Sequence, residues 1–280
     1  MTITIFTSLA GAPGVTTAAT AFAVHSARPT LLIEADTQNA SSMMPGLLRS
    51  NFRPQDGGIE KVIAAATSGV LSRSDLFNPE YALSIPLHNF QNLSDFPLPS
   101  LPEGHRLWAV PGFFHLNLAE GAGSVWPRLA PILQSVSDGG VDVVIDLGRV
   151  SHNDARLALI DTADFVIFCV EKSMIGLNRA VRRLQRDDLA GRTDALAREG
   201  RFWVLPIRPV AEEVSSKDLE KHTLPILPAL PHDPVGAATF SHGRPDAKPG
   251  RNRYRAAMRR VNGAMLVAQA NTVSGGNHRV

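Results

Sequence analysis

The stretch LAGAPGVTT, residues 9–17, decides the fold expected for this chain. It follows a short apolar run, MTITIF, and precedes a run of small residues, AATAFAVHSA. A strand, a glycine-rich loop and a helix in that order build a phosphate-binding loop, in which backbone N–H groups point into one concavity at the helix N-terminus. Gly11 and Gly14 let the backbone curl close to a phosphate. Thr16 takes the position whose hydroxyl reaches Mg²⁺ in such loops, and Thr17 follows it.

The loop departs from the usual phosphate-loop pattern G-x-x-x-x-G-K-[ST] at one position. Val15 stands where the pattern requires a lysine, and Pro13 removes one N–H from the cradle. An ordinary turn between a strand and a helix explains the two glycines equally well. The loop by itself is therefore a weak indication of a nucleotide site.

Three acidic residues at the ends of predicted strands strengthen the interpretation. Glu34 and Asp36 end the strand in TLLIEADTQNASS, and Asp146 ends the one in VDVVIDLG. Residues two apart on a strand point to the same side, so we expect Glu34 and Asp36 to face the loop. Asp146 matches the buried-strand carboxylate that holds a metal ion or its waters in nucleotide hydrolases. A solvated strand end explains any one acid, but three together with the loop favour a site.

Apolar runs alternate with helical patterns along the chain, which predicts an α/β fold with a mostly parallel twisted sheet of about seven strands flanked by helices. The strands are expected at residues 2–7, 30–36, 106–111, 141–148, 164–171, 202–207 and 224–231. The helices are expected at residues 16–26, 58–68, 124–137, 153–162, 175–189 and 251–270. We expect one domain over residues 1–270, with an irregular excursion at 76–104 and a disordered tail at 271–280.

Composition excludes several classes of protein. The chain has 280 residues and a formal net charge of +2, so it is not a general polyanion binder. Its single cysteine, Cys169, excludes an internal disulfide and an Fe–S cluster held by several thiolates. No apolar run approaches the roughly 20 residues of a membrane span, and no basic region opens a secretory signal. We therefore expect a cytoplasmic protein.

Four segments resemble the ParA/MinD family of deviant P-loop ATPases, which belongs to the SIMIBI class. They are LLIEADTQNAS, DVVIDLGRV, DTADFVIFCVEKSMIGLNRAVRRL and LPILPALPHDPVGAATFSHGRP. The resemblance covers residues 1 to about 250 with gaps and is weakest over 43–105. Within the family the chain is most similar to actinobacterial members with a GSPGVTT-type loop, some of which resemble TadZ/CpaE, localisation factors of pilus secretion systems.

The resemblance implies a P-loop NTPase fold that binds ATP and Mg²⁺. Asp36 then takes the family's water-activating position, and Thr16 and Asp146 hold the metal. Protein partners and a homodimer are also implied. The nucleotide would be contacted by Gly11, Gly14, Val15, Thr16 and Thr17.

Three positions depart from the family pattern. The family has two loop lysines where this chain has Ala10 and Val15, and Glu34 is longer than the usual aspartate. Loss of one preorganised donor typically costs about 100- to 1,000-fold in rate. We therefore expect a weak or inactive ATPase that acts as a positioning or scaffold component. The alternative is an active ATPase switch for DNA or cargo partition that uses Lys172 or Arg149 as a substitute cation.

Two basic segments suggest further binding functions. The first consists of Arg179, Arg182, Arg183 and Arg186, which are spaced to share one helix face. Nonspecific DNA binding by an accessory protein and a solvated surface both explain this face. The second is RNRYRAAMRR, residues 251–260, which opens a helix with an apolar stripe. The stripe suits either membrane binding or docking on the domain; it consists of Tyr254, Met258, Val261, Met265 and Ala268.

Overall fold

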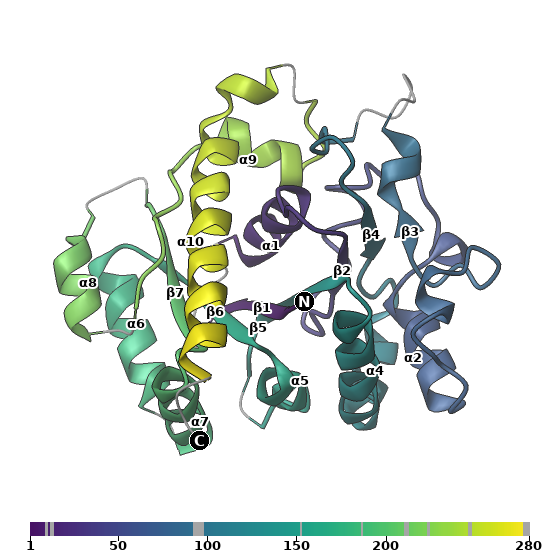
Figure 1. Cartoon of the computed structure of the whole chain (residues 1–280), viewed down its shortest axis with the longest axis horizontal. Helices are drawn as coiled ribbons and strands as arrows, with labels where there is room; N and C mark the ends of the chain where they lie inside the picture. The colour runs from purple at the N-terminus through teal and green to yellow at the C-terminus, as the bar shows by residue number, and fades with distance from the viewer. Residues whose placement is uncertain are drawn as a thin grey trace.

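A computed structural model describes residues 1–8, 11, 14–91, 98–151, 153–185, 187–209, 213–222, 225–245 and 248–276. Its centre is a seven-stranded sheet with helices on both faces (Figure 1). The strands are β1 (Ile3–Ser8), β2 (Thr30–Glu34), β3 (Ile85–Pro86), β4 (Leu107–Val110), β5 (Asp142–Arg149), β6 (Phe165–Glu171) and β7 (Phe202–Ile207). Their spatial order is β3-β4-β2-β5-β1-β6-β7. All neighbouring pairs are parallel except β3 with β4, so the predicted fold class is confirmed.

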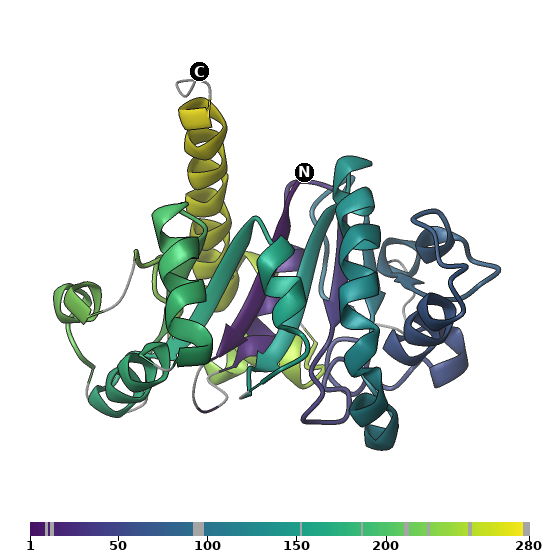
Figure 2. The ribbon, with the colours of Figure 1, turned by 90° about the horizontal axis from the view of Figure 1, so that it is seen from below.

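Ten helices are described around the sheet. They are α1 (Val15–Val24), α2 (Ile59–Thr67), α3 (Leu116–Gly121), α4 (Trp126–Asp138), α5 (Leu157–Thr162), α6 (Met174–Leu184), α7 (Asp187–Arg198), α8 (Ser216–His222), α9 (Pro234–Ser241) and α10 (Arg253–Gly276). The views in Figures 1 and 2 show α1, α9 and α10 on one face and α4, α5 and α6 on the other.

Alternate residues of each central strand enter two separate cores. In β5, Val143 and Ile145 pack in the core on the α4 side, whereas Val144 packs in the core on the α1 side. In β6, Phe168 and Cys169 divide in the same way. Both faces of the sheet are covered, which explains why VVID and FVIFCV are apolar without alternation.

The structure corrects the predicted seventh strand. Residues 225–231 form only two isolated bridges to β7, at Ile226 and Leu230. The seventh strand is instead β3, a two-residue antiparallel edge strand inside the expected excursion at 76–104. Pro225, Pro228 and Pro231 interrupt the expected strand, because a proline donates no ladder hydrogen bond. The helix expected at 175–189 is also divided, into α6 and α7.

The last helix is docked on the domain over its first part. Tyr254, Met258, Val261 and Met265 are buried, and they belong to the core on the α1 side. The apolar stripe of the membrane hypothesis is therefore covered by the chain itself. No helix among the described residues is long and apolar enough to cross a membrane.

The end of α10 differs from the expected disordered tail. The helix continues through residues 271–276 to Gly276. Its end projects beyond the sheet on the side where the N-terminus lies (Figure 2). Six of the residues expected in the tail thus belong to α10, and the disorder of the tail stays a prediction. Residues 277–280 lie outside the described part of the chain.

Candidate nucleotide site

The loop between β1 and α1 lies at the carboxyl edge of the sheet. Gly11 and Gly14 have φ values of 72° and 75°, a left-handed conformation that glycine adopts without strain. Gly14 is the N-cap of α1, and its carbonyl accepts from the Ala18 N–H at 2.9 Å. The first N–H groups of α1 form a site that favours an anion. Ala10 lies outside the described residues, so its predicted role remains a prediction.

Val15, at the position of the missing lysine, is buried. Its side chain is 4% exposed and packs in the core with Phe6 and Ala18. The side chain is therefore turned into the core, and the predicted contact of Val15 with a nucleotide stays a prediction. Thr16 and Thr17, in contrast, are half-buried and keep some accessible surface.

Asp146, the carboxylate predicted to hold the metal ion, is buried at the end of β5. Its side chain is 1% exposed, and Oδ1 accepts from the Gly148 N–H at 2.8 Å. Oδ2 is buried and receives no hydrogen bond of normal geometry within the described chain. Burial, and secondarily the charge of Glu34, raise the pKa of Asp146 to about 7, although the neighbouring Thr16 hydroxyl opposes this.

The open oxygen of Asp146 and the Thr16 hydroxyl fit a Mg²⁺ ion. A divalent cation near Oδ2 would satisfy a buried oxygen atom that otherwise has no partner. No group of three or more His, Cys, Asp or Glu side chains among the described residues can hold a metal ion. Mg²⁺ commonly takes one or two protein ligands and completes its shell with phosphates and water, so two ligands such as Thr16 and Asp146 would be enough to hold it.

Glu34 is held by the turn that follows β2. It pairs in register with Asp146 and is 2% exposed. Its carboxylate accepts from the Ser41 hydroxyl at 2.5 Å, from the N–H groups of Ser42 and Met43, and from the Gly112 N–H at 2.9 Å. Burial raises the pKa of Glu34 despite these hydrogen bonds. The described donors to its carboxylate lie in the segment after β2 and at Gly112, and the expectation that Glu34 faces the loop stays a prediction.

Asp36 lies just beyond β2 and beside the end of β5. Its carboxylate accepts from the Gln38 N–H at 2.8 Å and from Asn39 Nδ2 at 3.0 Å. It packs against Gly148, where an added Cβ atom would lie 2.5 Å from the Asp36 carboxyl carbon. The charge of Asp36 is felt by Asp146. The fold thus brings Thr16, Asp36 and Asp146 together as the sequence predicted.

The two proposed substitute cations have different environments. Lys172 is buried, and its Nζ lies 3.3 Å from Glu213 Oε2. Arg149 is exposed at the end of β5. Lys172 therefore already forms an ion pair with Glu213, which lies outside the loop.

Sequence reasoning missed Arg156, a fully buried arginine beneath the strand ends. It is 1% exposed and forms a bidentate pair with Asp154, at 2.8 and 2.5 Å. Its remaining donors reach the carbonyls of Ala35, Leu147 and Arg149 at 2.5–3.0 Å. All five N–H groups of the guanidinium are therefore used. Arg156 ties the end of β2 to the end of β5, the two strands that carry the acids.

The predicted basic face of α6 is only partly a surface feature. Arg179 and Arg182 are exposed, but Arg183 Nη2 donates to the Val150 carbonyl at 2.8 Å. Arg186 lies outside the described residues. The described part of this face offers fewer free cations to DNA than the sequence spacing suggested.

The sequence matches no protein-family model and no curated protein, but solved structures share its fold. The ParA family ATPase of Chlorobium tepidum superposes with a TM-score of 0.64 at 14% identity, over 92% of this chain and 96% of that one. The septum site-determining protein MinD of Pyrococcus horikoshii, complexed with Mg-ADP, gives 0.63 at 14% identity, over 99% and 98%. A variant of McdA from Cyanothece in complex with ATP gives 0.60 at 18% identity, over 96% of each chain.

The chain has the ParA/MinD fold. The likeness extends over nearly the whole length of each protein. Of these similar proteins, MinD of Pyrococcus horikoshii contains Mg-ADP and the McdA variant contains ATP.

Proposed function

We propose that this chain is a ParA/MinD-like positioning or scaffold protein whose nucleotide site hydrolyses ATP slowly or not at all. The observation that carries the proposal is the environment of Val15. Phosphoryl transfer depends on positioning and on stabilising spread negative charge, and the loop lysine normally supplies both. Here that position holds an apolar side chain that packs in the core.

The residues that remain support binding better than hydrolysis. The glycine loop, Thr16 and the open oxygen of Asp146 suit a Mg²⁺–phosphate group. When bound, Mg²⁺ would neutralise phosphate charge, while Thr16 and Asp146 hold it and the N–H groups of α1 orient the phosphates. Asp36 lies at the edge of this site, and the hydrogen bonds from Gln38 and Asn39 fix the orientation of its carboxylate.

The cargo in this proposal is a pilus or secretion assembly. Support comes from the sequence resemblance to TadZ/CpaE-type localisation factors. A structural neighbour, MinD of Pyrococcus horikoshii, is a septum site-determining protein. Spatial positioning is thus a function that this fold carries in another protein.

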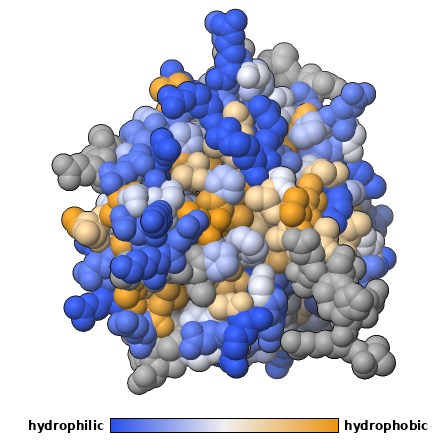
Figure 3. Space-filling view, turned by 60° about the vertical axis from the view of Figure 1, so that its left-hand side comes forward, coloured by the Kyte–Doolittle hydropathy of each residue, from blue (hydrophilic) through white to orange (hydrophobic). Residues whose placement is uncertain are grey.

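Exposed apolar side chains near the carboxyl edge suit protein contacts. Leu116 and Leu118 on α3 are 44% and 48% exposed, and Met174 and Ile175 at the start of α6 are 70% and 63% exposed. Helix α3 follows β4 and helix α6 follows β6, so both helices begin on the carboxyl side of the sheet. On the side that carries α6 and α8, Figure 3 shows hydrophobic residues in a broken central area with hydrophilic residues around them. A homodimer or another protein partner would cover such side chains.

A steady-state ATPase assay tests the catalytic part of the proposal. We expect turnover of the purified protein with Mg-ATP to be indistinguishable from that of Asp36→Ala. Turnover that is well above background and abolished by Asp36→Ala would refute it. Equilibrium binding of a fluorescent ATP analogue, measured for wild type and Asp146→Asn, separates a site that binds from a site that is empty.

The rival function is an active ATPase switch, and the open Oδ2 of Asp146 favours it. Because Lys172 pairs with Glu213, such a switch would depend on Arg149. Arg149→Gln would then abolish both turnover and ATP-dependent dimerisation. Under our proposal the same substitution leaves the oligomeric state unchanged.

Light scattering after size exclusion tests the contact surface. Met174→Asp/Ile175→Asp should weaken self-association or partner binding without loss of fold. Val70→Asp is the matched control, because Val70 is 71% exposed but lies beyond α2, on another part of the molecule.

A further inference from the structure

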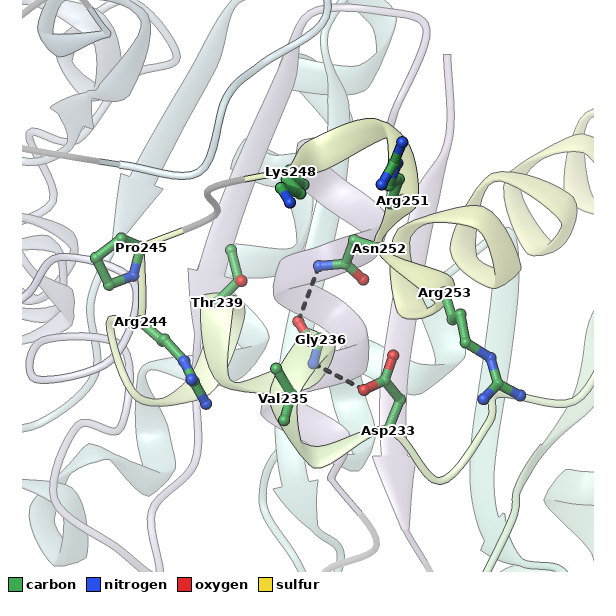
Figure 4. Close-up of a pocket in the computed structure, with 10 residues that line it drawn as sticks. All are labelled: Asp233, Val235, Gly236, Thr239, Arg244, Pro245, Lys248, Arg251, Asn252 and Arg253. Atoms are coloured by element: carbon green, nitrogen blue, oxygen red, sulfur yellow. Dashed lines mark hydrogen bonds between the residues drawn. The ribbon is translucent and has the colours of Figure 1, made fainter.

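A pocket lies between α9 and α10, in the helical layer that also contains α1 (Figure 1). It is a cavity of about 370 Å³ between α9, the segment that follows it and the start of α10. Figure 4 shows Thr239, Gly236 and Asn252 at its centre. None of the loop or acidic residues of the nucleotide site lines it.

Cationic side chains surround this pocket. They are Arg244, Lys248, Arg251 and Arg253, and all four are exposed. In Figure 4 they lie around Thr239, Gly236 and Asn252, with Arg244 and Arg253 on opposite sides. Because the whole chain carries a formal net charge of only +2, four cations at one concavity are a strong local excess.

Among the described lining residues one side chain is a carboxylate, that of Asp233, and its charge offsets one of the four cations. Asp233 is the N-cap of α9, and its Oδ1 accepts from the Gly236 N–H at 2.9 Å. Asn252 is likewise fixed, since its Nδ2 donates to the Gly236 carbonyl at 3.2 Å and its Oδ1 accepts from the Arg255 N–H. These bonds fix the start of α9 against the start of α10 at the centre of the pocket.

The basic segment 251–260 is divided by the fold. Arg255 is 3% exposed and turns inward, where its Nη1 lies 3.1 Å from His25 Nε2. Arg251 and Arg253, on either side of Asn252, border the pocket instead. The basic segment thus contains one buried arginine, Arg255, and two arginines at the pocket, while Arg259 and Arg260 are exposed further along α10.

We propose that this pocket binds a soluble small molecule that carries two or more phosphate groups. Arginine guanidinium groups match phosphate oxygens in a bidentate manner. The volume falls within the range of roughly 300–1,000 Å³ typical of small-molecule sites, and a concave pocket suits a compact ligand better than a duplex. Val235 and Pro245 add apolar wall for the remainder of the ligand, and the Thr239 side chain adds a hydroxyl.

Isothermal titration calorimetry with inorganic tripolyphosphate at 150 mM NaCl tests the proposal. We expect binding of one equivalent to the full-length protein. Arg244→Gln/Arg251→Gln should weaken it by at least about tenfold, because two charge-assisted contacts are lost. The matched control is Arg179→Gln/Arg182→Gln on α6, which removes the same charge from exposed positions elsewhere and should leave the affinity unchanged.

Three further outcomes decide against the proposal. Equal weakening by both arginine pairs would mean nonspecific attraction to surface charge. Binding that survives Arg244→Gln/Arg251→Gln but is lost in Thr16→Ala would place the phosphates at the β1–α1 loop. No heat of binding, or binding of a DNA duplex alone, would exclude a small-molecule site. Circular dichroism of each variant verifies that a lost signal is not a lost fold.

Discussion

The carboxylate of Asp36 lies directly against Gly148, so close that an added Cβ atom would be 2.5 Å from the Asp36 carboxyl carbon. Gly148 also has a φ of 59°, and its N–H donates to Asp146 Oδ1. One glycine thus lets two acids from different strands approach the same point. Its small size is a condition for the acidic site.

Replacement of Gly148 by alanine should disturb this arrangement. The left-handed conformation costs an alanine about 1 kcal/mol, and the new methyl group would also displace Asp36. We expect Gly148→Ala to lower the free energy of unfolding by roughly 1–3 kcal/mol in urea denaturation. Gly263→Ala is the control. Gly263 lies within α10, and a Cβ atom added there would have no neighbouring atom within 4 Å. We expect this variant protein to be slightly more stable than wild type, because alanine favours a helix over glycine. Equal stability of wild type and Gly148→Ala would contradict the close approach.

The raised pKa of Asp146 predicts a pH dependence of stability. In the unfolded chain the carboxyl titrates near 3.8, whereas its pKa is about 7 in the folded protein. Between these values the folded state keeps a proton that the unfolded state has lost. The free energy of unfolding therefore falls as the pH rises from about 4 to about 7.

Asp146→Asn removes this titration and isolates its effect. The stability of the variant relative to wild type should increase between pH 5 and pH 8, by on the order of 3 kcal/mol. Urea denaturation at four pH values measures the difference. In the control Asp75→Asn the difference from wild type should stay flat over this range, because hydrogen bonds from Ser72 lower the pKa of Asp75 below its usual value. A flat difference for Asp146→Asn as well would show that Asp146 is ionised throughout.

Arg156 and Asp154 should be strongly coupled. Removal of one partner from a buried ion pair leaves an uncompensated charge and typically costs about 3–5 kcal/mol. We expect Arg156→Met and Asp154→Asn each to destabilise by that amount, and the double variant by clearly less than the sum. The exposed pair Arg192–Asp161 is the comparison, and its coupling should not exceed about 1 kcal/mol. Additive effects at Arg156 and Asp154 would show that the pair does not act as a unit.

The burial of Val15 predicts a stability role for a residue at a nucleotide-loop position. Val15→Ala should lower the free energy of unfolding by about 1.5–3 kcal/mol, since a buried valine loses its apolar contacts. Val235→Ala should be nearly neutral, because that side chain is 59% exposed. Thermal and urea denaturation of the two variants give the comparison. If Val15→Ala were as neutral as Val235→Ala, the side chain would instead face the phosphate site.

Local sequence patterns were sufficient for six of the seven strands and for part of the site. Continuous apolar runs indicated strands covered on both faces, and glycines followed by Thr16 indicated a loop before a helix. Parallel strands end at one edge, so Asp36 and Asp146 were expected near that loop. These inferences depend only on strand direction and side-chain alternation, which neighbouring residues determine.

The tertiary structure decided which of these side chains are buried or hydrogen-bonded and which are accessible to a ligand. Nothing near Glu34 in the sequence reveals that the Gly112 N–H, 78 residues away, will bind its carboxylate. Arg156 likewise acts on the carbonyl of Ala35, 121 residues away, and Val15 is buried by residues of other elements. The sequence by itself determined the types of group at this edge and their order along the chain. Only the packing of distant segments determined which charged side chains are paired, that Asp146 Oδ2 has no hydrogen bond of normal geometry within the described chain, and which exposed cations surround the pocket beside α9. Burial and hydrogen bonding depend on neighbours that the fold supplies.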